Sequence, residues 1–188
     1  YQRGVILRRA ASILRQRLDE VARDVTRENG KLLREARGEV ARSADFFEYY
    51  GAFGRWPEGS ILPDERDGVQ VLTRREPVGV VLAITPWNDP ILTPARKLAP
   101  ALIAGNVVII KPAPETPLSV WHLAHILEEA GLPAGVLNVI TGQAEVLVPP
   151  LLEHPEVRAI TFTGSTEVGL YLLRQASRRN VRVQTEMG

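Results

Sequence analysis

Short apolar runs rich in β-branched residues alternate with helical stretches of ten or more residues, and this alternation constrains the fold most. Strands that alternate with helices of this length indicate βαβ units and a parallel sheet. Several runs are apolar at consecutive positions, which is typical of strands covered on both faces. The runs are Val69–Thr73, Val78–Thr85, Val107–Ile110, Val136–Ile140, Ala159–Thr163 and Val181–Thr185, with helices expected at about 91–104, 117–130, 144–153 and 166–177. We therefore predict an α/β fold with a doubly wound, Rossmann-like parallel sheet in residues 69–188.

The N-terminal segment, residues 1–55, is expected to be helical. Its apolar residues recur at steps of three, four and seven up to Val25, and Asn29-Gly30 is a plausible helix end. A second helix is expected over about 31–50, ending near Gly51 and Gly54. The Pro-, Gly- and Asp-rich stretch Trp56–Gly68 is expected to be a loop. A helical pair thus precedes the predicted sheet.

Composition argues against several classes of function. The formal net charge is +1, and the eleven basic and six acidic residues of positions 1–42 interleave at helical spacing, which favours a solvated helix face over a nucleic-acid surface. The sequence has no cysteine and only three histidines without a carboxylate cluster, so we expect no disulfide and no metal site. No apolar run reaches about 18 residues, and no signal peptide is visible. We expect a cytoplasmic protein that binds neither nucleic acid nor membrane.

Polar and glycine residues collect where the predicted strands end. Ligands of open α/β sheets bind outside the carboxyl ends of the strands, so these residues should share one edge and form a candidate site. They are Thr85-Pro86-Trp87-Asn88, Lys111-Pro112, Thr141-Gly142, Thr163-Gly164-Ser165 and Glu186.

Three of these positions suit an anionic nucleotide. Gly164 permits a tight turn and Ser165 can begin the next helix, where a pyrophosphate would meet backbone amides, although a plain helix cap explains the same residues. Lys111 could contact a ribose or phosphate, or be a solvated lysine. The sequence lacks G-x-G-x-x-G, so the usual dinucleotide fingerprint is absent.

Three others suit reaction chemistry or stacking. The amide of Asn88 could donate to a developing oxyanion, and the alternative is a turn asparagine that bonds its own backbone. Glu186 could act as a general base, and the alternative is a surface glutamate. Trp87 could flank a cofactor or pack in the core.

Taken together, the motifs resemble the aldehyde dehydrogenase superfamily from about Gly4 to Gly188. The resemblance lies in their order and spacing as well as in their residues. They are Ile84-Thr85-Pro86-Trp87-Asn88, Pro94-Ala95-Arg96-Lys97, Ala104-Gly105-Asn106, Lys111-Pro112-Ala113, Ala130-Gly131-Leu132-Pro133, Gly135-Val136-Leu137-Asn138, Phe162-Thr163-Gly164-Ser165-Thr166-Glu167-Val168-Gly169 and Glu186-Met187-Gly188.

The resemblance implies a role for each matching residue. Asn88 corresponds to the asparagine that stabilises the thiohemiacetal oxyanion, and Glu186 to the glutamate that activates water against the thioester. Lys111 corresponds to the lysine at the adenosine ribose, and Ser165 to a residue at the pyrophosphate. The remaining cofactor-binding set is Ile84, Thr85, Pro86, Trp87, Gly142, Gly164 and Gly169. The expected cofactor is NAD, with NADP as the alternative.

Some positions depart from the family pattern. Pro114 stands where an acidic residue often binds the adenosine ribose, with Glu115 one step later, which weakens the preference for NAD. A Gly-x-Gly turn is replaced by Gly142-Gln143-Ala144. Asp89 stands where Phe is frequent, and it could affect the site or cap the next helix; we favour the cap.

The resemblance also implies what the chain would do within a complete enzyme. Such an enzyme oxidises an aldehyde to a carboxylic acid with NAD(P) through a cysteine thioester and usually forms homo-oligomers. We expect residues 1–188 to be a partial dinucleotide-binding domain that is truncated, with the catalytic domain and its cysteine beyond Gly188, and to be inactive alone. The alternatives are an acylating CoA-dependent aldehyde dehydrogenase or phosphate-releasing reductase, which the base at Glu186 disfavours, and a non-catalytic nucleotide-binding or oligomer-interface module.

Overall fold

The computed structural model describes residues 1–55 and 59–188 of the chain. Its helices are α1 (Gln2–Gln16), α2 (Leu18–Asn29), α3 (Leu33–Ala52), the 3-10 turn η1 (Phe53–Arg55), α4 (Leu92–Ile103), α5 (Leu118–Glu129), α6 (Ala144–Glu153) and α7 (Thr166–Ser177). Its strands are β1 (Gly59–Leu62), β2 (Val71–Arg74), β3 (Val80–Ile84), β4 (Val107–Lys111), β5 (Leu137–Val139), β6 (Val157–Gly164) and β7 (Arg182–Met187).

Five of the strands form a parallel sheet in the order β5-β4-β3-β6-β7. Strands β4 and β5, which follow β3 in the sequence, lie on one side of it, and β6 and β7 lie on the other side. The order therefore reverses between β3 and β6, which makes this the switch point where ligands of doubly wound sheets bind. The predicted Rossmann-like parallel sheet is confirmed.

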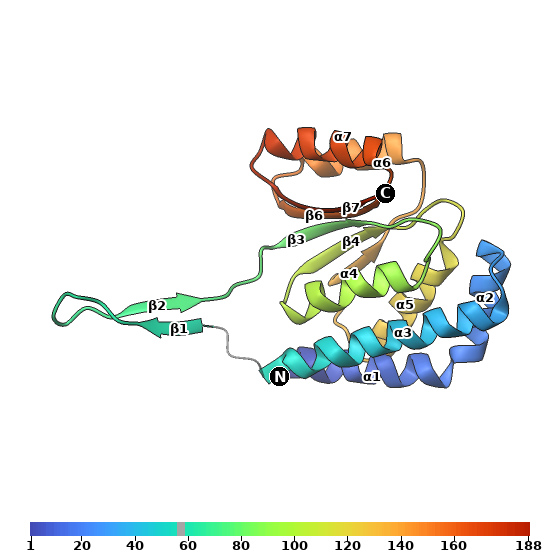
Figure 1. Cartoon of the computed structure of the whole chain (residues 1–188), viewed down its shortest axis with the longest axis horizontal. Helices are drawn as coiled ribbons and strands as arrows, with labels where there is room; N and C mark the ends of the chain where they lie inside the picture. Colours follow the sequence, from blue (N-terminus) through green and yellow to red (C-terminus); the bar gives the residue numbers. More distant parts are fainter. Residues whose placement is uncertain (56–58) are drawn as a thin grey trace.

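Helices cover both faces of this sheet. Helices α6 and α7 lie on one face, α4 and α5 lie on the other, and α1, α2 and α3 form a further layer beneath α4 and α5 (Figure 1). Along β3, Val81 and Ala83 pack into the core on the α4 side, whereas Leu82 packs into the core under α6 and α7. Strand residues point alternately to opposite faces, so an unbroken apolar run is what two covered faces require. Within the described residues no helix has the length and apolarity needed to cross a membrane.

The N-terminal layer contains one more helix than the predicted pair. The first predicted helix is divided at Arg17, whose backbone (φ −98°, ψ 15°) ends α1 before α2 begins. The break redirects the chain so that α2 packs against both α3 and α5. Gly30 then ends α2 in the left-handed conformation (φ 85°), as the Asn29-Gly30 pair predicts.

A separate hairpin corrects the prediction for residues 59–73. Strand β1 lies within the stretch expected to be a loop and pairs antiparallel with β2. The run at Val69–Thr73 therefore belongs largely to this hairpin, which projects away from the body of the fold (Figure 1), and not to the parallel sheet. The hairpin side chains are mostly exposed, so its first strand carries no continuous apolar pattern to detect. Positions 56–58 of the expected loop lie outside the described residues.

Candidate functional site

A groove of about 890 Å³ lies at the switch point, outside the carboxyl ends of β3, β4, β6 and β7. We call it the rim groove. All of the predicted site residues except Gly142 and Gly169 line it. Its lining comprises Ile84, Thr85, Pro86, Trp87, Asn88, Lys111, Pro112, Ala113, Pro114, Phe162, Thr163, Gly164, Ser165, Val168, Glu186, Met187 and Gly188.

The two remaining glycines lie elsewhere. Gly142 follows β5, the edge strand, and has a positive φ of 146°. Gly169 lies inside α7, and a Cβ placed there would collide with the side chain of Met187 and approach Phe162. Gly169 therefore leaves room for the Met187 side chain between α7 and β7, at the wall of the rim groove.

Lys111 is the last residue of β4 and is almost fully buried, with 3% of its surface exposed. Its Nζ donates to the carbonyl of Pro112 at 3.2 Å. Burial lowers the pKa of Lys111, while the charges of Glu145 and Glu115 oppose that effect. The interpretation of Lys111 as a solvated lysine is wrong.

The start of α7 forms another wall of the groove. Ser165 is the N-cap, with extended backbone, and its hydroxyl accepts from the amide of Val168 at 3.4 Å. The cap explanation for Ser165 is thus confirmed, and the cap leaves the first helix amides directed at the groove. Trp87, on the facing loop, is 58% exposed, so the core interpretation of this residue is wrong.

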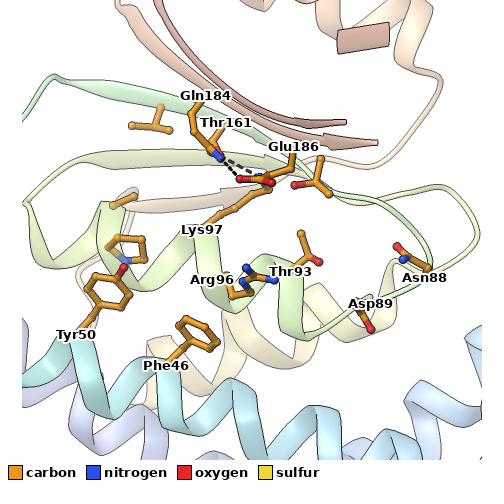
Figure 2. Close-up of a pocket in the computed structure, with 14 residues that line it drawn as sticks. Phe46, Tyr50, Asn88, Asp89, Thr93, Arg96, Lys97, Thr161, Gln184 and Glu186 are labelled. Atoms are coloured by element: carbon orange, nitrogen blue, oxygen red, sulfur yellow. Dashed lines mark hydrogen bonds between the residues drawn. The ribbon is translucent and has the colours of Figure 1, made fainter. Parts of the chain in front are cut away.

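A second cavity of about 650 Å³ adjoins the rim groove. We call it the inner pocket (Figure 2), and it shares Asn88, Thr163 and Glu186 with the rim groove. The other lining residues come mainly from α3, α4, β6 and β7. They are Phe46, Tyr50, Val81, Asp89, Thr93, Arg96, Lys97, Pro100, Ala101, Thr161 and Gln184.

A chain of hydrogen bonds crosses the inner pocket from α4 to the candidate base. Lys97 Nζ donates to Thr161 Oγ1 at 2.9 Å, and that hydroxyl donates to Gln184 Oε1 at 2.5 Å. Gln184 Nε2 then donates to Glu186 Oε1 at 3.1 Å, and Figure 2 shows the four side chains grouped together. Burial lowers the pKa of Lys97 to about 8, with Glu186 raising it and Arg96 lowering it further.

Apart from Glu186, these residues of the inner pocket have no assigned role in the prediction from sequence. Lys97 had one detectable signal, because it falls between the buried apolar residues Ala95 and Leu98 of a helix. Arg96, its neighbour, is exposed in the inner pocket, with its guanidinium carbon 5.7 Å from the centre of the Phe46 ring. The pocket therefore combines an exposed cation, a buried amine and the Glu186 carboxylate.

The expectation for Asp89 is wrong. Helix α4 has Ile91 as its N-cap, and the carboxylate that accepts from its first amides is that of Glu39 in α3, at 3.0 Å from the nitrogens of Ile91 and Leu92. Asp89 Oδ1 instead lies 3.5 Å from the ammonium of Lys31. Sequence proximity favoured Asp89, whereas the tertiary packing of α3 supplies the cap.

The fold and the site together define the doubly wound α/β class, with adjoining cavities at the switch point of a Rossmann-like sheet. Within that class, the chain belongs to the aldehyde dehydrogenase family, whose model matches residues 1–188.

Individual relatives agree with this assignment. The chain is 45% identical to alpha-ketoglutaric semialdehyde dehydrogenase of Bacillus subtilis strain 168, over all of this chain and 38% of the relative. It is 40% identical to succinate-semialdehyde dehydrogenase [NADP(+)] GabD of Escherichia coli strain K12, over all of this chain and 39% of that relative. A solved aldehyde dehydrogenase from Brucella melitensis biovar abortus 2308 superimposes with a TM-score of 0.97 at 41% identity, covering 99% of this chain and 38% of that one. The chain thus spans less than two-fifths of the length of these relatives.

Proposed function

We propose that the protein containing this chain oxidises an aldehyde to a carboxylic acid with NAD(P), and that these residues supply the cofactor groove and two groups that act on the substrate. The observation that carries the proposal is the wall shared by the two cavities. Asn88, after β3, and Glu186, in β7, line both the rim groove and the inner pocket. A cofactor in the groove and an aldehyde in the pocket would therefore meet at these side chains.

The rim groove suits a dinucleotide on its own chemistry. The buried cation of Lys111 lies at the end of β4, and the amide-rich start of α7 lies behind Ser165. A cation and a helix N-terminus both stabilise a diphosphate. A bound nicotinamide dinucleotide would supply the acceptor for the hydride that leaves the aldehyde carbon.

Asn88 and Glu186 would act on the substrate in turn. The Asn88 amide donates a hydrogen bond to the oxygen of the former aldehyde as negative charge develops on it. Glu186 takes a proton from the water that releases the acid. The reaction in this proposal also needs a thiol nucleophile, and this chain contains no cysteine. We therefore place the thiol in a part of the protein outside residues 1–188.

The role of Glu186 is tested in the full protein with Glu186→Gln. Loss of the base should lower steady-state turnover by about 10²–10⁴. A burst of NAD(P)H should persist, because hydride transfer precedes water attack, and the acyl-enzyme should accumulate on rapid quenching. Glu153→Gln, at the exposed end of α6, serves as the matched control. Unchanged steady-state turnover in Glu186→Gln would overturn the assignment.

The favoured substrate class is an aldehyde that carries a second carboxylate. Arg96 places an exposed guanidinium in the inner pocket, where it can bind a carboxylate with two parallel hydrogen bonds. The relatives from Bacillus subtilis and Escherichia coli are named as semialdehyde dehydrogenases. Arg96→Leu should raise KM for succinate semialdehyde by about 10–100-fold and leave KM for butanal nearly unchanged. Equal changes for both aldehydes would refute this choice.

We further propose that the complete enzyme is a homo-oligomer that uses the hairpin of β1 and β2. Ile61 is 78% and Leu72 is 66% exposed on this projecting element, and their strands also leave backbone groups unpaired at the edges. Ile61→Asp should reduce the assembly to smaller species in sedimentation velocity. An unchanged sedimentation coefficient would argue against the hairpin as the interface.

A further inference from the structure

The loop that carries Asn88 is held from below by the N-terminal helical layer. Asn29 Nδ2, at the end of α2, donates to the carbonyl of Trp87 at 2.7 Å. Lys31 Nζ, two residues later, donates to the carbonyl of Asn88 at 2.7 Å. Two consecutive peptide groups of the loop are therefore fixed by side chains that lie nearly sixty residues earlier in the sequence.

Lys31 is itself fixed by a buried carboxylate. Its ammonium forms an ion pair with Glu39, and the side chains of Lys31 and Glu39 are only 14% and 1% exposed. Asp89 adds a second negative charge 3.5 Å from the ammonium. Charges taken out of water are costly unless their partners are well placed, so this pair holds one geometry firmly.

Glu39 links the same arrangement to α4. Its Oε1 accepts from the amides of Ile91 and Leu92, both at 3.0 Å, while its Oε2 faces Lys31. One carboxylate thus caps the helix that carries Arg96 and Lys97 and also holds the ammonium that binds the Asn88 carbonyl. Both ends of the segment from Asn88 to Leu92 are attached to α3 through Glu39.

We propose that Lys31 and Glu39 are positioning residues that set the place of the Asn88 amide. This inference rests on the proposed function, in which Asn88 donates to the oxyanion. Neither side chain is among the residues that line the rim groove or the inner pocket, so both act through the loop. Misplacing the Asn88 amide should raise the energy of the transition state more than it weakens the binding of cofactor or aldehyde.

The kinetic experiment is a double-mutant cycle in the full-length protein. Asn88→Ala should lower kcat by about 10²–10³, and Lys31→Met by about 10-fold, with KM for the cofactor unchanged in both. Adding Lys31→Met to Asn88→Ala should cost no further activity, because the donor that Lys31 positions is already gone. Losses that multiply, or a Lys31→Met variant with wild-type kcat, would overturn the proposal.

Two further variants guard against misfolding. Lys31→Met combined with Glu39→Gln removes both charges and keeps an oxygen that can accept from the amides of Ile91 and Leu92, so α4 retains its cap. Arg37→Met, on the same helix as Glu39, breaks the exposed ion pair with Asp19 of α2 and serves as the matched control. The paired variant should show the same loss of kcat as Lys31→Met, and the control should show none. A paired variant with wild-type kcat would also count against the proposal.

Hydrogen exchange separates this inference from the proposed function. In the full-length protein, Lys31→Met should speed exchange of the amides in 88–92 by at least about 10-fold. The amides of Leu118 and Ser119, which are capped by Glu28 of α2, should keep their wild-type exchange rates. Unchanged exchange in 88–92 would overturn the positioning role whatever the activity. A wild-type protein that oxidises no aldehyde would instead overturn the proposed function. The exchange rates would still show whether Lys31 fixes the loop.

Discussion

Lys97 offers the sharpest physical prediction, because burial moves its pKa from 10.5 to about 8. At ~1.4 kcal/mol for each tenfold change in proton affinity, the charged form costs about 3 kcal/mol in the folded state. The folded pKa lies below the unfolded value, so the unfolded chain binds more protons between about pH 8 and pH 10.5. Stability from this group therefore rises as pH increases through that window, and its cost is fully present below pH 8.

The perturbation is Lys97→Met, which removes the titrating amine and nearly keeps the side-chain length. Between pH 7 and pH 9 the wild type should gain about 1 kcal/mol of unfolding free energy relative to the variant. Urea unfolding of both proteins at the two pH values measures the difference and cancels the groups that they share. The other two lysines of the chain, Lys31 and Lys111, are present in both proteins, so their titration cancels as well.

The titration of Lys97 can also be measured directly. With lysine-specific isotope labelling, the side-chain signal that is missing in Lys97→Met should titrate at about pH 8 in the wild type. Glu186→Gln should lower this pKa further, because the Glu186 charge raises it in the wild type. A Lys97 signal that titrates near 10.5, or unfolding free energies that change in parallel with pH, would refute the reasoning.

Three further substitutions test the rim groove, the packing of α7 and the contacts at the amino ends of β3 and β4. Pro114 lines the rim groove at the position that the family resemblance assigns to the adenosine ribose, which carries the extra 2′-phosphate in NADP. Pro114→Glu should therefore weaken NADP binding by at least about 10-fold and NAD binding less, as measured by fluorescence titration, and equal changes would contradict a cofactor bound with its adenosine ribose at this residue. Gly169→Ala places a methyl group where the Met187 side chain lies, but that side chain is exposed and can turn away, and alanine favours a helix interior by about 1 kcal/mol. The free energy of unfolding in urea should therefore change by less than about 1 kcal/mol, and a loss above about 2 kcal/mol would show that Met187 cannot move. The buried Asn106 side chain accepts hydrogen bonds from two backbone amides and donates one to a carbonyl. Asn106→Leu should therefore lower the free energy of unfolding by about 3 kcal/mol in the same assay, and a loss below about 0.5 kcal/mol would contradict a stabilising role for these bonds.

The parallel sheet could be predicted because its signal is local and repeated. The apolar runs of β3 and β4 and the helical stretches of α4 to α7 appear within the sequence at the positions the structure confirms. The groove could be anticipated for a related reason, since parallel strands place their carboxyl ends at one edge. Strand β1 had no such signal, because its side chains are exposed and its partner belongs to an isolated hairpin.

The inner pocket and the hydrogen bonds that fix the Asn88 loop could not be predicted in this way, because they depend on contacts between elements that are distant in sequence. Glu39 reaches Leu92 across more than fifty residues, and Lys97 reaches Thr161 across more than sixty. Periodicity places Glu39 on a helix but does not say which helix it will face. Asp89 shows how nearness in sequence can mislead, since the cap of α4 came from α3.

The positions of the lysines indicate that lysine and arginine have different roles in this chain. Only three of the 23 basic residues are lysines: Lys97 lines the inner pocket, Lys111 lines the rim groove, and Lys31 binds the Asn88 carbonyl from outside both cavities. Arginine stays charged under all ordinary conditions and suits exposed ion pairs such as Arg37 with Asp19. An ammonium is compact and can lose its proton, so it fits a tight cavity at a lower cost than a guanidinium. Replacing any of the three with arginine would therefore enlarge the cation and remove its ability to lose a proton, even though the formal charge at pH 7 would be the same.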